Sequence, residues 1–185
     1  MHFITFSCYR RLPLLGSPAV RDLFMATLVR ARQRHNFKLI AWVVMPEHVH
    51  LMLVPTAGKA HGSTLPSILI GIKKPVATRA LAQWKRLRWN GLAELADAGG
   101  NLHFWQPGGG FDRNVRDAAE LYREVVYMHQ NPVTRGLVDK SIDWAWSSAR
   151  SYAGWPKQFA KHDSIMIDSN AFPGPRAERW LGDAV

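Results

Sequence analysis

Two apolar stretches with only two residues between them constrain the fold of this chain more than any other feature. Phe37–Met45 is apolar at nearly every position, and His48–Val54 follows directly after Pro46 and Glu47. Strands joined by so short a connection pair as antiparallel neighbours. A strand that is apolar on both faces belongs in the interior of its sheet. The sequence therefore predicts an antiparallel hairpin whose first strand is central in a sheet.

The remaining elements follow in an order that indicates a fold class. Alternating side chains predict a strand over His2–Tyr9, and Ser17 and Thr64 are N-cap residues that each open a helix. Residues 90–112 are rich in glycine, and Leu102–Gln106 is a short candidate fourth strand within them. The order strand, helix, strand, strand, helix, strand predicts an α+β, ferredoxin-like split βαβ sandwich, with an antiparallel sheet and helices on one face.

A third helix is expected C-terminal to this sandwich. It begins at Asp112 or Asn114 and runs to about Gln130, since Asn131 precedes Pro132 and a residue before proline disfavours the helical conformation. This added helix carries the tyrosine discussed below.

The chain is long enough for one domain with a packed core, because its 185 residues are 47% hydrophobic. We expect the domain to cover residues 1–153, with the aromatic segment Trp144–Ala153 docked on the core. Residues 154–185, which contain prolines and glycines, are expected to form an irregular tail. Pro75 removes a backbone hydrogen bond from the second helix and is expected to kink or divide it.

Composition excludes a protein that spans a membrane with a helix and a small secreted protein that is held together by disulfides. The longest apolar run, residues 39–46, has eight residues, whereas a membrane-spanning helix needs about 20. The single cysteine, Cys8, cannot form an intrachain disulfide. We therefore expect a cytoplasmic protein with no membrane partner.

Positive charge is concentrated in the first half of the chain. The first 93 residues contain 14 Lys and Arg but only two acids, Asp22 and Glu47. The densest basic segment contains Lys73, Lys74, Arg79, Lys85, Arg86 and Arg88. Such a surface attracts polyanions such as nucleic acid, although a solvated basic face without a ligand has the same composition.

Tryptophans accompany this basic segment. Trp84, Trp89 and Trp105 could stack on unpaired bases, as aromatic side chains do in proteins that bind single strands. The alternative for each ring is packing in the core.

His48 and His50 are two residues apart on a predicted strand, so both imidazoles point to the same face. Two imidazoles at this spacing can bind one divalent cation. The alternative is a pair of histidines without a ligand, because this spacing alone is common. Glu47 could orient one of them, or only cap the turn.

Tyr127 and Asn131 are four residues apart and share one face of the third helix. The phenol could act as a nucleophile, and the amide oxygen could complete a metal site. Taken singly, each residue also fits a structural role, Tyr127 as a half-buried aromatic and Asn131 as a helix cap.

In combination these motifs resemble the single-tyrosine HUH transposases of the IS200/IS605-like type, and within them the REP-associated tyrosine transposases. The matching segments follow one another in the family's order over about residues 2–153. They are Ala41–Leu53 (AWVVMPEHVHLML), Lys73–Lys74, Phe104–Pro107 (FWQP), Tyr127–Val133 (YMHQNPV), Gly136–Val138 and Asp143–Ser148 (DWAWSS). The glycines at 108–110 and Pro75 depart from the family's pattern.

The resemblance implies a metal-dependent DNA endonuclease and strand transferase. Tyr127 matches the nucleophile that forms a 5′-phosphotyrosine intermediate, and His48, His50 and Asn131 match ligands of Mg²⁺ or Mn²⁺. The implied partner is single-stranded DNA with hairpins, either REP-like elements or transposon-end palindromes. The basic residues listed above and Trp105 would bind this DNA. A protein bound to it would be nucleoid-associated, as a monomer or homodimer.

Two other functions fit parts of the sequence. A non-catalytic nucleic-acid-binding protein derived from such a transposase would retain the basic surface without cleavage. A zinc-dependent hydrolase of small molecules would use the histidine pair, but it lacks an evident carboxylate as general base and has no need of the basic surface.

Overall fold

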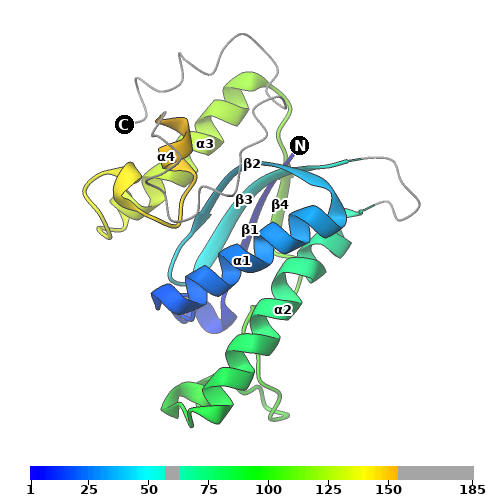
Figure 1. The fold of residues 1–185 in the computed structure, drawn as a ribbon, viewed down its shortest axis with the longest axis vertical. Helices are drawn as coiled ribbons and strands as arrows, with labels where there is room; N and C mark the ends of the chain where they lie inside the picture. Colours follow the sequence, from blue (N-terminus) through cyan, green and yellow to red (C-terminus); the bar gives the residue numbers. More distant parts are fainter. Residues whose placement is uncertain (57–62, 154–185) are drawn as a thin grey trace.

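A four-stranded antiparallel sheet forms the centre of the molecule (Figure 1). The computed structural model describes residues 1–56 and 63–153; the expected tail, 154–185, lies outside them. The strands are β1 (His2–Ser7), β2 (Phe37–Val44), β3 (His48–Pro55) and β4 (Phe111–Asn114), in the order β2-β3-β1-β4. This order, with all neighbours antiparallel, confirms the ferredoxin-like prediction.

Helices cover both faces of the sheet. Helices α1 (Pro18–His35) and α2 (Leu65–Arg86) lie side by side over one face, where they enclose the larger apolar core (Figure 1). Helix α3 (Ala118–Thr134) packs on the opposite face against a second core. The short helix α4 (Ala149–Tyr152) follows. The added third helix was therefore predicted correctly, and it gives the sheet a second covered face.

The two long helices begin as the sequence predicts. The Ser17 hydroxyl accepts a hydrogen bond from the amide of Val20, and the Thr64 hydroxyl accepts one from Ser67. Helix α2 continues through Pro75, so the proline does not divide it. Within the described part of the chain, no helix has the length and hydropathy needed to cross a membrane.

Strand β2 lies at the end of the sheet, which corrects the prediction that it is central. Its apolar pattern has another cause, since both of its faces are covered and its outer edge is paired with residues 146–148. The amide of Val44 donates to the carbonyl of Trp146, and the amide of Ser148 donates to that of Trp42. The segment after Trp144 therefore docks on the core as predicted and protects an apolar edge strand.

The fourth strand was predicted in the wrong place. Leu102–Gln106 makes only isolated bridges, and the strand is Phe111–Asn114, paired with β1. Gly110 permits this pairing because its φ is +84° and a Cβ there would lie 2.3 Å from the carbonyl oxygen of Thr5. A backbone contact of this kind leaves no hydrophobic pattern in the sequence.

The bounds of α3 also differ from the prediction. Because Asp112 and Asn114 belong to β4, the helix starts later, capped by the Asp117 carboxylate, which accepts from the amide of Glu120 at 2.7 Å. It continues past Asn131 and through Pro132 to Thr134. The left-handed Gly136, with φ of +65°, then ends it. Asn131 is thus a residue of the last turn and not a terminal cap.

Candidate active site

A cleft of about 330 Å³ opens between the sheet and α3, and we call it the histidine cleft. Strand β1, strand β3, helix α3 and the turn after β1 all contribute to it. Its lining residues are Thr5, Ser7, Arg11, His48, His50, Tyr127, Gln130, Asn131, Thr134 and Arg135. The structure thus brings the four predicted catalytic and metal-binding residues together from segments about 80 residues apart in sequence.

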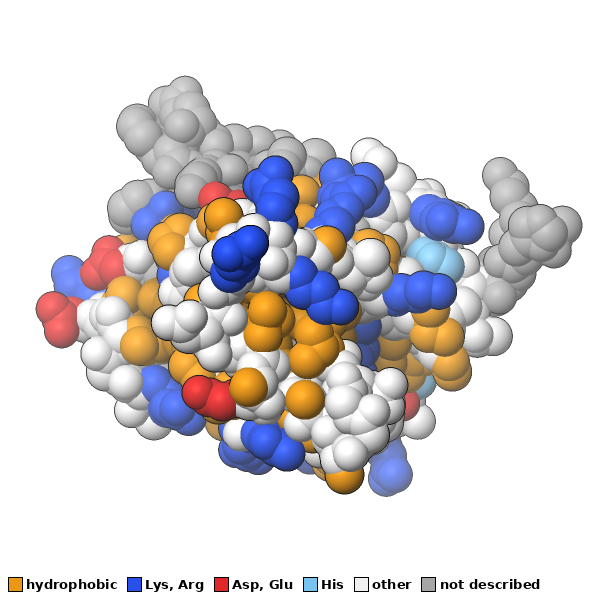
Figure 2. Space-filling model, turned by 90° about the horizontal axis from the view of Figure 1, so that it is seen from below, with side chains coloured by type: hydrophobic (Ala, Val, Ile, Leu, Met, Phe, Trp, Pro, Cys, Tyr) orange, Lys and Arg blue, Asp and Glu red, His pale blue; other side chains and the backbone are white. Residues whose placement is uncertain are grey.

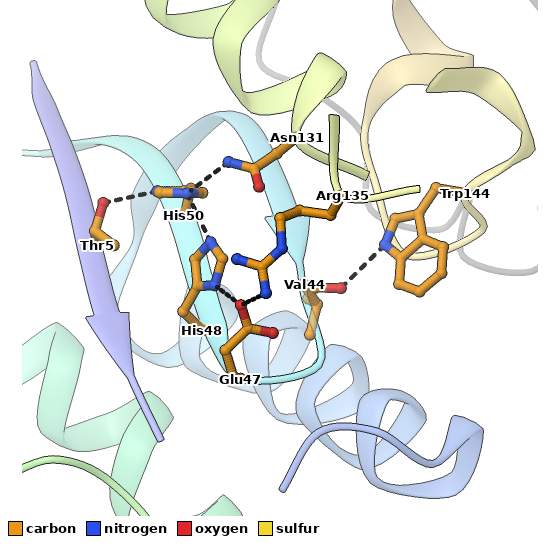
Figure 3. Close-up of polar contacts among 8 residues, drawn as sticks. All are labelled: Thr5, Val44, Glu47, His48, His50, Asn131, Arg135 and Trp144. Carbon is orange, nitrogen blue, oxygen red and sulfur yellow. Dashed lines mark hydrogen bonds and ion pairs between the residues drawn. The ribbon is translucent and has the colours of Figure 1, made fainter. Parts of the chain in front are cut away.

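The two histidines face each other at the start of β3, with their Nε2 atoms 3.0 Å apart (Figure 3). Each ring is held by its Nδ1 atom. The Nδ1–H of His48 donates to the carboxylate of Glu47 at 3.1 Å. The Nδ1 of His50 bonds to the hydroxyl of Thr5 at 2.7 Å, because Thr5 lies directly opposite His50 on β1.

Both histidines favour the neutral form. Burial lowers the pKa of His50 to about 3, with a further contribution from His48. Burial also lowers the pKa of His48, although the adjacent Glu47 acts in the opposite direction. Neutral imidazole is the form that binds metals.

The donor set fits a divalent cation. With both Nδ1 atoms engaged, the Nε2 atoms of His48 and His50 converge, and a cation would take both of them as ligands in their unprotonated form. The amide nitrogen of Asn131 lies 3.2 Å from the Nε2 of His50 (Figure 3). A half-turn of this amide would present its oxygen instead. Among the described residues, no group of three or more His, Cys, Asp or Glu side chains could hold a metal, and the Asn131 amide would be the third donor beside the two imidazoles.

Tyr127 reaches the cleft from the solvent side of α3. Its side chain is 52% exposed, and its ring centroid lies 5.5 Å from that of His50. The ring of Phe3 contacts both, stacking on His50 and meeting Tyr127 edge-on. An exposed phenol on the rim of a histidine cleft is accessible to a large substrate.

Glu47 connects the histidine pair to α3. Its carboxylate accepts from His48 and also pairs with Arg135 at 2.9 Å, just beyond the helix that carries Tyr127 (Figure 3). Of the two roles considered for Glu47, the structure shows the orienting one. Sequence reasoning missed Arg135 and Thr5; the position of Thr5 follows from strand register, which no local motif encodes.

The basic segment, residues 73–88, does not line the histidine cleft. Five of its residues, Lys74, Arg79, Lys85, Arg86 and Arg88, are exposed. Lys73 is partly buried, donates to the carbonyl of Gly108 at 3.0 Å, and has a pKa lowered by burial. Since α2 packs on the face opposite α3, DNA contacts by these residues would lie outside the cleft.

Trp105 is only 7% exposed and packs against Phe6 and Phe104. Its indole N–H donates to the carbonyl of Lys73 at 2.9 Å. Little of the ring is therefore exposed to an unpaired base, although Trp105 also lines a pocket together with Lys73 and Lys74. Its role is to join the segment after α2 to the core.

The chain is similar in sequence to two curated proteins. No family model matches the chain. It is 23% identical over 121 residues to the REP-associated tyrosine transposase of Escherichia coli, covering 65% of this chain and 59% of that protein. It is 24% identical over 127 residues to a putative REP-associated tyrosine transposase of Haemophilus influenzae, covering 68% and 66% respectively. The chain thus spans less than two thirds of the length of the curated relatives it matches.

The fold is shared with a solved protein. The structure of a REP-associated tyrosine transposase bound to a REP hairpin superposes with a TM-score of 0.61 at 21% identity, covering 95% of this chain and 90% of that one. The sequence similarity to the two curated relatives relates the chain to the REP-associated tyrosine transposases, and the solved structure shows that it shares the fold of one of them.

Proposed function

We propose that the chain is a metal-dependent endonuclease and strand transferase for single-stranded DNA that carries hairpins. The observation that carries this proposal is the convergence of Tyr127, the histidine pair and Asn131 on one cleft. A phenol can act as the nucleophile of a phosphodiester transfer, and two neutral imidazoles can hold a divalent cation that assists it.

In the proposed reaction the oxygen of Tyr127 attacks a phosphorus atom in the DNA strand. An oxygen–phosphorus bond to Tyr127 forms and the bond from phosphorus to the 3′ oxygen breaks. The tyrosine proton is lost and the departing 3′ oxygen gains one, leaving a free 3′-hydroxyl and a 5′-phosphotyrosine. The new ester retains the energy of the old one, so a second 3′-hydroxyl can reverse the step without ATP.

The residues around the tyrosine have separate tasks. His48, His50 and Asn131 would hold Mg²⁺ or Mn²⁺, which supplies positive charge against the phosphate. Glu47 and Thr5 bond to the Nδ1 atoms of His48 and His50, which would leave both Nε2 atoms for the metal. The guanidinium groups of Arg11 and Arg135 add positive charge to the cleft and would position the anionic strand.

The substrate class rests on charge and on the relatives. A phosphate-binding protein needs exposed cations, and α2 presents four of them, with Arg88 exposed just beyond its end. The solved relative is bound to a REP hairpin. We therefore propose hairpin DNA with single-stranded flanks as the substrate of this chain, bound by Lys74, Arg79, Lys85, Arg86 and Arg88, with Lys73 in a lesser role.

A covalent-adduct assay tests this function. An end-labelled hairpin oligonucleotide incubated with Mg²⁺ or Mn²⁺ should yield a protein–DNA band that chelation abolishes. Tyr127→Phe should remove the band, whereas Tyr122→Phe on the same helix should retain it, because Tyr122 lies outside the residues that line the cleft. His50→Ala should lose the adduct and keep DNA binding. Binding without an adduct under either metal would instead support the non-catalytic DNA-binding alternative.

A further inference from the structure

A second cleft, which we call the tryptophan pocket, lies where α2 ends. Its volume is about 340 Å³, within the range of small-ligand pockets, about 300–1,000 Å³. It is lined by Leu12, Pro13, Leu14, Ser17, Trp84, Trp89 and Glu94. The proposed reaction uses none of these residues. Two indole rings and three aliphatic side chains make its lining mainly apolar.

The two rings of the pocket are held in place. Trp84 stacks on the buried Phe104 with ring centroids 5.5 Å apart, and the ring of Trp89 lies 4.8 Å from that of Trp84. Trp89 also lies against Gly91, where a Cβ would come within 2.3 Å of the indole. Trp89 remains 40% exposed. One indole is thus anchored in the core while the other is rigid and accessible, as a stacking platform must be.

Basic residues adjoin the two tryptophans in the sequence, whereas the charged residue among those that line the pocket is Glu94. Lys85, Arg86 and Arg88 are exposed at the end of α2. Figure 2 views the molecule from the end at which α2 terminates, and hydrophobic side chains gather at its centre with Lys and Arg around them. Apolar rings bordered by cations complement a ligand with flat aromatic groups on an anionic backbone, which is single-stranded nucleic acid. Glu94 adds a hydrogen-bond acceptor for the exocyclic amino group of a base.

The pocket and the histidine cleft are lined by consecutive residues at the turn after β1. Arg11 lines the cleft and the next residue, Leu12, lines the pocket. The turn that connects them is unusual, since Arg10 and Arg11 have φ of +50° and +56°. Consecutive Cα atoms are about 3.8 Å apart. A strand that reaches both sites would pass from the α3 face of the sheet to the α2 face around this turn.

We propose that the tryptophan pocket binds an unpaired base of the same DNA strand whose phosphate lies in the histidine cleft. The base stacks on Trp89, and the cations at the end of α2 contact the adjacent phosphates. This inference rests on the proposed function for the identity of the strand. It adds a site that selects substrates with unpaired bases beside the cleaved position.

The test measures binding in the presence of a chelator, so that cleavage plays no part. The probes are a fluorescent hairpin with single-stranded arms of about ten nucleotides and the same hairpin without arms. Trp89→Ala should weaken binding of the armed hairpin about tenfold, the effect of losing one stacked base, and leave the armless hairpin unchanged. Trp89→Phe should restore most of the affinity. Leu87→Ala is the matched control, because Leu87 is 62% exposed at the same end of α2 but does not line the pocket.

Abasic substitutions provide a second measurement that does not depend on the stability of a variant. In the wild-type protein, removal of the base at one or two positions of an arm should weaken binding about tenfold. In Trp89→Ala the same removal should cost nothing further. An equal loss on both hairpins, or no sensitive position in the arms, would overturn the proposal. If the adduct at Tyr127 forms but binding does not depend on Trp89 and an unpaired base, only the pocket proposal fails. If binding depends on both but no adduct forms, only the proposed reaction fails.

Discussion

Glu47 contacts both His48 and Arg135, and its replacement by glutamine tests which of the two contacts determines metal affinity. The carboxylate accepts from His48 at 3.1 Å and pairs with Arg135 at 2.9 Å. Glutamine has nearly the same shape, so packing is retained. Its amide oxygen can still accept from His48. The negative charge of Glu47, which favours the Nδ1–H tautomer of His48 and attracts the guanidinium of Arg135, is lost.

The structure sets different magnitudes for the two consequences. The Arg135 side chain is 53% exposed, and an ion pair with so much solvent contact contributes at most about 1 kcal/mol to the free energy of unfolding. The Glu47 side chain is only 12% exposed and directly contacts a proposed metal ligand. Loss of such a partner typically weakens metal binding about 10–100-fold. Glu47→Gln should therefore affect metal affinity far more than stability.

The assay is a titration of Mn²⁺ into the protein by calorimetry, with thermal unfolding recorded in parallel. Arg135→Gln is the matched control, because it removes the same ion pair and leaves the contact between Glu47 and His48. We expect Glu47→Gln to bind Mn²⁺ about 10–100-fold more weakly, and Arg135→Gln to stay close to wild type. Equal losses in the two variants would show that the position of α3, and not the orientation of His48, determines metal affinity. An unchanged Glu47→Gln would refute the reasoning altogether.

Three further predictions concern DNA binding, pH and folding. Lys74→Gln should lower the slope of log K against log salt by about one in filter-binding assays, whereas Lys140→Gln, far from α2 in the chain, should leave it unchanged. Burial lowers the pKa of His129 to about 3. As pH falls below about 6.5, this histidine takes up a proton in the unfolded chain but not in the folded one. The free energy of unfolding should therefore fall by about 1.4 kcal/mol per pH unit between about pH 6.5 and pH 3. His129→Gln should flatten this dependence in urea titrations, and an unaltered slope would contradict it. Gly110→Ala should destabilise the fold by about 1–3 kcal/mol, because its left-handed backbone abuts Thr5, while Gly109→Ala, with open space around it, should not.

The parts of the fold that local patterns encode were predictable. The hairpin of β2 and β3 and the caps at Ser17 and Thr64 follow from apolar runs and capping residues. The position of β4 was not, because it depends on the close approach of Gly110 to β1, a contact between segments about 100 residues apart. The same holds for β2, whose outer edge is covered by a segment equally distant in sequence.

In the candidate site, too, local spacing predicted some residues, whereas others depend on contacts between distant segments. The spacing of His48 and His50 placed both rings on one face, and the spacing of Tyr127 and Asn131 placed them on one side of α3. Thr5 enters the site through strand register and Arg135 through the continuation of α3 beyond Pro132, and neither leaves a local signal. Trp105, which was expected to contact DNA, is only 7% exposed and packs in the core.

The most direct test of the phenol's role is mass spectrometry of the covalent product. The protein is incubated with hairpin DNA and Mn²⁺, then digested with nuclease and protease, and the peptide that carries a residual nucleotide is sequenced. The account predicts a phosphodiester on the side-chain oxygen of Tyr127. A nucleotide attached to any other residue, or a cleaved strand with no protein attached at any time in the reaction, would contradict it.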